Sequence, residues 1–323
     1  MLNYCLVFCL AIYIVILIAT FFSNNEERVR TDLAQSMIDN QAPVIELIGG
    51  DSMTMAVGDT FVEPGFDVYD VGSVPKLEIE GLVDVKHPGD YEILYHAYDN
   101  QYNVSDVTRK VKVINPAGRI YLTFDDGPSE YTGSLLDVLK KYNVKATFFV
   151  TGYGDDAMIK REFDEGHAVG LHTNTHMYSY VYSSLDNYVA DLNAVRDRVR
   201  NITGQSTKLV RFPGGSSNVI SARYDGGNKI MSKLVGLMGE WGYTYFDWNV
   251  DSDDAGGAHT SEQVFANVVD GIKKGGDLIV LQHDVKPDSV EAVEGIIQYA
   301  LENNYVFAKL TPDSFTAHHS VNN

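Results

Sequence analysis

The chain has only two cysteines among its 323 residues, and it has few basic side chains. Cys5 and Cys9 both lie in the first ten residues, far from any segment that could form a core, so a disulfide framework and a thiolate metal site are excluded. Lysine and arginine number 25 against 44 acidic residues, giving a formal net charge of -19. Nucleic acid is bound through clustered basic side chains, so we expect no nucleic-acid partner.

Charged residues are also absent from positions 6–22, which form an apolar run without strong turn formers. With the residues before it, the run reaches about 20 positions, enough for a helix to cross a bilayer. A cleaved signal peptide is the alternative, but no small-x-small cleavage site follows. We therefore expect a single transmembrane anchor over residues 1–23 and a polar linker over residues 24–41.

Residues 42–116 consist of short alternating runs, such as DYEILYHAYD and VTRKVKVI, bounded by Gly, Pro, Asp or Asn. Their regular spacing predicts a small antiparallel sandwich of about seven strands. The pattern PGDYEILYHAYDN resembles the closing strands of bacterial immunoglobulin-like surface domains.

Residues 117–323 alternate between strand and helix patterns, which predicts a parallel sheet or barrel. The candidate strands are IYLTF, ATFFV, HAVGL, KLVRF, YTYFD, DLIVL and YVFAK. Five of these seven strands have chemically rich residues at their carboxyl ends, in DDGP, HTNTH, RFPGG, DWNVDSDD and QHD. Active sites of such folds form at this end of the strands, so we expect the site there.

His172 and His176 are four residues apart, so a helix or tight turn would place both rings on one face. Neutral imidazoles are good zinc ligands, and a carboxylate from Asp125 or Asp126 would complete a three-ligand site with a position open for water. The remaining aspartate could then take a proton from that water as it attacks a carbonyl.

Two further groups would complete a hydrolytic site. Arg211 could hold the basic aspartate in position beside the metal. His283 could protonate the leaving group if a nearby acid such as Asp254 raised its pKa. The side chains therefore predict metal-assisted hydrolysis at a carbonyl.

Five motifs follow one another from Arg119 onward: TFDDGP, HTNTH, RFPGG, DWNVDSDD and LQHD. In this order they resemble the polysaccharide deacetylases, carbohydrate esterase family 4, over about 200 residues. The resemblance implies a distorted (β/α) barrel of about seven parallel strands and a metal-dependent deacetylase. It also implies zinc as the metal, with cobalt or nickel able to substitute.

By position, the resemblance assigns the individual roles. It makes Asp125 the base, Arg211 the residue that orients it, His283 the general acid, Asp254 the residue that tunes the acid, Asp126, His172 and His176 the metal ligands, Gly214 an oxyanion-binding N–H, and Trp248 and Leu281 the lining of an acetyl pocket. Two positions depart from the family. Gly214 stands where many members have tyrosine, and Ala255 stands where an aromatic residue often follows.

These features predict hydrolysis of N-acetyl groups on N-acetylglucosamine units of a cell-wall polysaccharide, best matched by peptidoglycan. The membrane anchor and the immunoglobulin-like spacer would hold the catalytic domain outside the cell membrane, near the wall. Chitin oligomers or O-acetyl xylan are alternative substrates. A non-haem iron oxygenase, which also uses two histidines and a carboxylate, and a catalytically inactive surface binding protein are alternatives of other classes.

The remaining acids and histidines are expected to be structural. Asp247, Asp251 and Asp253 are interpreted as loop acids that cap backbone groups or border the site. His318 and His319 lie in the polar segment AHHSVNN, for which we expect a frayed terminus.

Overall fold

The computed structural model describes residues 27–28, 30, 40–71 and 75–323. The predicted anchor, residues 1–23, lies outside the described residues, as does most of the predicted linker. Within the described part of the chain, no helix combines the length and the apolar character needed to cross a membrane. The anchor and the boundaries 42–116 and 117–323 stay predictions.

The chain forms two compact units. The first comprises the described residues up to 46 and those within 66–80 and 94–108, and the second comprises residues 47–65, 81–93 and 109–323.

Six strands are found in the described residues of the N-terminal region, where about seven were expected. They are β1 (Val44–Leu47), β2 (Ser52–Ala56), β3 (Phe66–Tyr69), β4 (Lys76–Glu80), β5 (Gly89–Tyr98) and β6 (Val104–Ile114). β1 pairs with β3, while the other four form a sheet in the order β2-β6-β5-β4. β4 and β5 are antiparallel, but β2 and β6 run parallel, so the wholly antiparallel prediction is wrong for that pair. Alternate residues of β5 are buried, as expected for a strand with one face on a core.

The parallel sheet predicted for the C-terminal region is confirmed. Its strands are β7 (Gly118–Asp125), β8 (Thr147–Val150), β9 (Ala168–Leu171), β10 (Leu209–Val210), β11 (Thr244–Tyr245), β12 (Val250–Asp251), β13 (Leu278–His283) and β14 (Tyr305–Phe307). They are ordered β11-β10-β9-β8-β7-β13-β12, with β14 also on β7, and their pairs are parallel. This open sheet fits a distorted (β/α) barrel. All seven predicted strands are present, and the two-residue β12 is additional.

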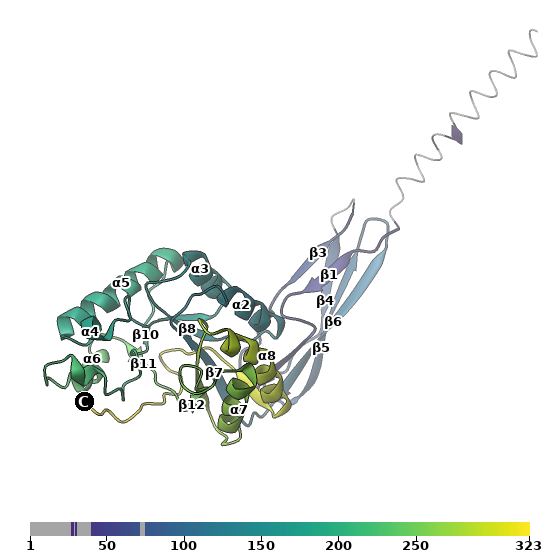
Figure 1. The fold of residues 1–323 in the computed structure, drawn as a ribbon. Helices are drawn as coiled ribbons and strands as arrows, with labels where there is room; N and C mark the ends of the chain where they lie inside the picture. Colours follow the sequence, from purple (N-terminus) through teal and green to yellow (C-terminus); the bar gives the residue numbers. More distant parts are fainter. Residues whose placement is uncertain (1–26, 29, 31–39, 72–74) are drawn as a thin grey trace, which may run out of the picture. The chain divides into compact units, whose positions relative to one another are not determined.

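Helices connect and cover these strands (Figure 1). They are α2 (Thr132–Lys141), α3 (Asp156–Asp164), α4 (Tyr178–Val181), α5 (Leu185–Thr203), α6 (Ile230–Met238), α7 (Ser261–Ile272) and α8 (Pro287–Glu302), with a 3₁₀ turn at Ser221–Arg223. Their apolar faces and the sheet enclose one core that includes Leu122, Phe148 and Ile296. Burial of one such side chain stabilises the fold by about 1.5–3 kcal/mol.

The strand register brings distant chemical groups to one edge of the sheet. Asp125, the last residue of β7, lies opposite Phe149 of β8 and His283 of β13. Leu171, the last residue of β9, lies opposite Val210 of β10. The loops that follow these strands therefore start side by side at the carboxyl edge, as the motif positions predicted.

Candidate active site

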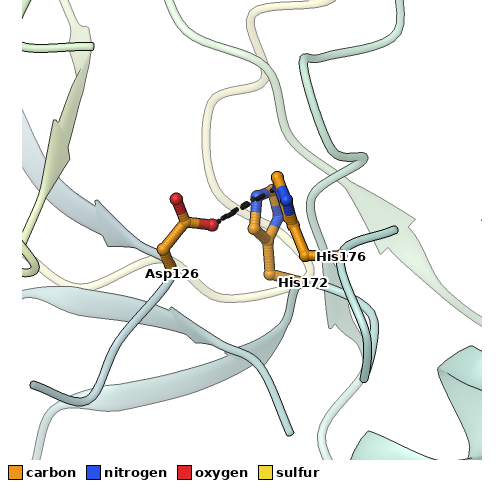
Figure 2. A group of neighbouring side chains, drawn as sticks. All are labelled: Asp126, His172 and His176. Carbon is orange, nitrogen blue, oxygen red and sulfur yellow. Dashed lines mark ion pairs between the residues drawn. The ribbon is translucent and has the colours of Figure 1, made fainter. Parts of the chain in front are cut away.

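Three side chains converge after β7 and β9, where Figure 2 shows the Asp126 carboxylate facing the rings of His172 and His176. Oδ1 of Asp126 lies 3.6 Å from Nε2 of His172 and 3.4 Å from Nε2 of His176. Two atoms that each lie 2.0–2.2 Å from a tetrahedral zinc ion are about 3.4 Å apart. The three ligand atoms are therefore spaced as ligands of one cation would be.

One oxygen of the Asp126 carboxylate also lacks a hydrogen-bond donor. Its Oδ1 is buried and has no hydrogen bond within the described residues. A buried carboxylate oxygen normally has a donor or a metal ion beside it. A divalent cation between the three side chains would satisfy this atom, so the residues present fit a metal site.

A hydrogen bond sets the tautomer of His172. Its Nδ1 lies 2.8 Å from the carbonyl oxygen of Arg211. Because a carbonyl can only accept, Nδ1 carries the proton and the lone pair of Nε2 points toward Asp126. The ring is thereby prepared to act as a ligand before any cation arrives.

Three non-glycine residues of the site have left-handed backbone conformations. The φ angles are 74° at Asp126, 65° at Thr173 and 51° at His176. Residues other than glycine rarely adopt φ values of this kind, and those that do cluster at functional sites. The HTNTH motif is thus a tight turn rather than a helix, the second of the two geometries that its spacing allowed.

Asp125 is buried beside the three candidate ligands, but Arg211 binds it. Its Oδ1 accepts a hydrogen bond of 3.0 Å from Nη1 of Arg211, while its Oδ2 lies 3.7 Å from Nε2 of His172. The guanidinium group is itself fixed, because it donates to the carbonyl oxygens of Phe246 and Asp247 at 3.0 and 3.1 Å. One oxygen of Asp125 is therefore held, and the other faces the cation site.

His283 and Asp254 form a second pair on the opposite side of β7. Nδ1 of His283 donates to Oδ1 of Asp254 at 2.8 Å, and the backbone N–H of His283 donates to Oδ2 at 2.7 Å. Burial alone would lower the pKa of His283, but the hydrogen bond and charge of Asp254, with the charges of Asp125 and Asp126, raise it to about 9. The imidazole is therefore protonated at neutral pH and can donate a proton.

The three predicted substrate-binding residues lie on two loops and one strand. Gly214 has φ 75° in the loop after β10, and the indole of Trp248 packs against the next residue, Gly215. Leu281 lies within β13, where it is buried between Thr123 and Asp251 in the register. Their roles in binding an oxyanion or an acetyl group stay predictions.

Tyr178 belongs to the site but was missed in the sequence. Its ring lies edge-on to His176, with 5.5 Å between centroids. Its hydroxyl would lie 2.7 Å from a Cβ at position 214, so a larger residue there would require the Tyr178 side chain to move. Burial and then the charges of Asp126 and Asp125 raise the pKa of Tyr178 to about 12, so the hydroxyl remains a donor. An aromatic residue two positions after the second histidine was the available signal.

Known families match both regions of the chain. Residues 112–226 match the family described as "Polysaccharide deacetylase", and residues 45–113 match "Bacterial surface protein, Ig-like domain".

Individual relatives match more than half of the chain. A peptidoglycan-N-acetylglucosamine deacetylase of Bacillus cereus is 35% identical over 199 residues, 58% of this chain and 67% of the relative. The solved catalytic domain of a peptidoglycan N-acetylglucosamine deacetylase from Eubacterium rectale is 47% identical with a TM-score of 0.62, over 64% of this chain and 94% of that domain. A polysaccharide deacetylase structure from Bacillus cereus is 33% identical with a TM-score of 0.52, over 64% of this chain and 96% of that structure.

The three-ligand geometry predicts that the metal-free chain binds one zinc ion. Loss of a residue that only supports a metal ligand weakens metal binding by about 10–100-fold. His176→Ala removes a ligand itself, so we expect it to weaken zinc binding by more than this. Calorimetric titration of chelator-stripped protein measures the change. His259→Ala, which removes an exposed histidine, is the control and should bind like the wild type. Equal zinc affinity in His176→Ala would show that these three residues do not hold the metal.

Proposed function

The chain belongs to the polysaccharide deacetylase family, and we propose that it removes N-acetyl groups from N-acetylglucosamine units of a cell-wall polysaccharide, with peptidoglycan as the substrate. The observation that carries the proposal is that the neighbouring carboxylates of Asp125 and Asp126 have different partners. Asp126 faces two imidazoles, whereas Asp125 is bound by Arg211. The substrate is inferred from the names of the relatives, two of which are peptidoglycan N-acetylglucosamine deacetylases.

The residues that would hold the cofactor are Asp126, His172 and His176. A divalent cation bound there would supply Lewis acidity for the acetyl carbonyl and for the attacking water. Two imidazoles and one carboxylate suit zinc, and cobalt or nickel could take the same place.

The other side chains would move the protons. Asp125 takes a proton from water as the water oxygen attacks the acetyl carbon, and Arg211 keeps the carboxylate aimed at that proton. The backbone N–H of Gly214 donates to the oxyanion of the tetrahedral intermediate. His283 gives its proton to the amide nitrogen as the C–N bond breaks, so the products are acetate and a glucosamine unit.

The remaining residues of the site would bind the acetyl group, and they argue against an iron oxygenase. Trp248 and Leu281 are the proposed contacts of the acetyl methyl group. A non-haem iron site needs only two histidines and a carboxylate, so it leaves Arg211 and the pair of His283 and Asp254 without a role.

The remaining regions would determine where the reaction occurs. We place the catalytic domain outside the cell, held at the membrane by residues 1–23 and spaced from it by the immunoglobulin-like region. The enzyme would then deacetylate peptidoglycan in place, in the cell wall outside the membrane.

The full chain is expected to release acetate from peptidoglycan and from N-acetylglucosamine oligomers, and a chelator should abolish the release until zinc is restored. Asp125→Asn should lower the rate by about 10²–10⁴-fold, the usual contribution of a general base. Enzymatic assay of acetate measures both effects. Release from acetylated xylan alone would instead establish an O-acetyl esterase, and no release by zinc-loaded protein from any of these substrates would contradict the proposal.

The pKa of His283 predicts the alkaline limit of activity. A general acid works in its protonated form, so the rate should fall as pH rises through the pKa of His283, which the hydrogen bond and charge of Asp254 raise above its usual value. Asp254→Asn removes the charge and should shift the alkaline limb of kcat/KM to lower pH. Asp270→Asn, at an exposed site on α7, is the control and should keep the wild-type profile. An unshifted limb in Asp254→Asn would remove Asp254 from this role.

A further inference from the structure

The C-terminal segment 318–323 is docked on the active-site loops, so the predicted frayed terminus is wrong. Figure 1 shows this segment ending beside α6. There the carbonyl oxygen of Asn323 accepts hydrogen bonds from the N–H and hydroxyl of Ser232, at 2.9 and 2.6 Å. Nδ2 of Asn322 donates to the carbonyl oxygen of Ser217 at 2.8 Å, in the loop that also contains Gly214.

His319 makes the most contacts with the site loops. Its backbone N–H donates to Oδ2 of Asp247 at 2.9 Å, and its Nε2 lies 2.6 Å from the carbonyl oxygen of Trp248. Nε2 must carry the proton, because a carbonyl only accepts, and Nδ1 is then free to accept from the hydroxyl of Ser217 at 3.1 Å. The imidazole also packs edge-on against the Trp248 ring, with 4.7 Å between centroids.

Asp247 links this segment to the rest of the site. Its fully buried carboxylate accepts from the backbone N–H of Ser216 at 2.8 Å, from the hydroxyl of Ser216 at 2.5 Å and from His319. A buried carboxylate is stable only with such donors, so the three residues hold one another in place. The backbone carbonyls of Asp247 and Phe246 are the ones that fix Arg211.

We propose that His319 is a positioning residue of the deacetylase reaction. It fixes the segment from Phe246 to Trp248, which orients Arg211, which in turn orients Asp125. The proposal rests on the function proposed above, since it concerns the alignment of the same base. His319 touches neither the metal ligands nor Asp125. Its backbone N–H binds Asp247, and its side chain acts through Ser217 and through the carbonyl oxygen and ring of Trp248.

The expected effect is larger on turnover than on substrate binding. An aspartate that is misplaced by about 1 Å can lose about 10²-fold in rate. The loss of one link in a chain of several should cost less, so we expect His319→Ala to lower kcat about tenfold. Its ring also packs against Trp248, a proposed contact of the acetyl methyl group, so we expect a smaller rise in KM beside the loss of kcat. Zinc affinity should stay at the wild-type value, because His172 binds the backbone carbonyl oxygen of Arg211 and not the guanidinium group that the segment from Phe246 to Trp248 fixes.

Acetate release by the full, zinc-loaded chain from N-acetylglucosamine oligomers tests this. His319→Gln keeps an N–H that can reach the Trp248 carbonyl, so it should restore most of the kcat lost in His319→Ala. His259→Ala is again the control and should match the wild type. A wild-type kcat in His319→Ala, or a loss that His319→Gln fails to restore, would overturn the positioning role.

A fluorescence measurement separates this proposal from the proposed function. The chain has two tryptophans, so Trp241→Phe leaves Trp248 as the only one, and its emission is excited selectively at the red edge of tryptophan absorption. In that background His319→Ala should change the emission of Trp248, and His259→Ala should not. If the emission of Trp248 changes in His319→Ala but the wild-type protein releases no acetate, the proposed function is overturned, and the positioning role is overturned with it. Unchanged emission would overturn the contact on which the proposal depends.

Discussion

The hydrogen-bonded ion pair between Arg211 and Asp125 is the interaction on which the active site depends. Both side chains are buried, and a buried charge is tolerated only when it is paired and its remaining donors are satisfied. Arg211 meets this condition through Asp125, Thr123 and two backbone carbonyls. Without the guanidinium, two adjacent carboxylates beside two imidazoles would compete for protons and for the same cation.

The backbone explains how neighbouring aspartates reach one site. Successive side chains of a strand point to opposite faces, so a regular strand would separate Asp125 from Asp126. The strand ends at Asp125, and the positive φ of Asp126 turns the next carboxylate back, so that both lie within 3.7 Å of Nε2 of His172. The left-handed backbone of Asp126 thus brings the two carboxylates close together. Of the two, Arg211 binds only Asp125, so the two carboxylates have different roles.

Much of this could be predicted because the sequence signals are local. Apolar runs alternating with helical patterns indicated seven parallel strands, and polar motifs at their carboxyl ends indicated the site edge. β12 was missed because its two residues, Val250 and Asp251, lie inside the polar motif DWNVDSDD and not in an apolar run. The parallel pairing of β2 with β6 depends on partners more than 50 residues apart. The docking of His319 was also unpredictable, since its partners, Asp247 and Trp248, are about 70 residues away and the segment itself is polar and aperiodic.

The crystal structure of the zinc-loaded chain, with anomalous scattering recorded at the zinc edge, would test the separation of the two carboxylates most directly. The predicted result is one peak bound by Oδ1 of Asp126 and Nε2 of both His172 and His176, with Asp125 still hydrogen-bonded to Arg211. A peak elsewhere, or one bound by Asp125 with its contact to Arg211 broken, would contradict the assignment of one aspartate to the metal and the other to the proton.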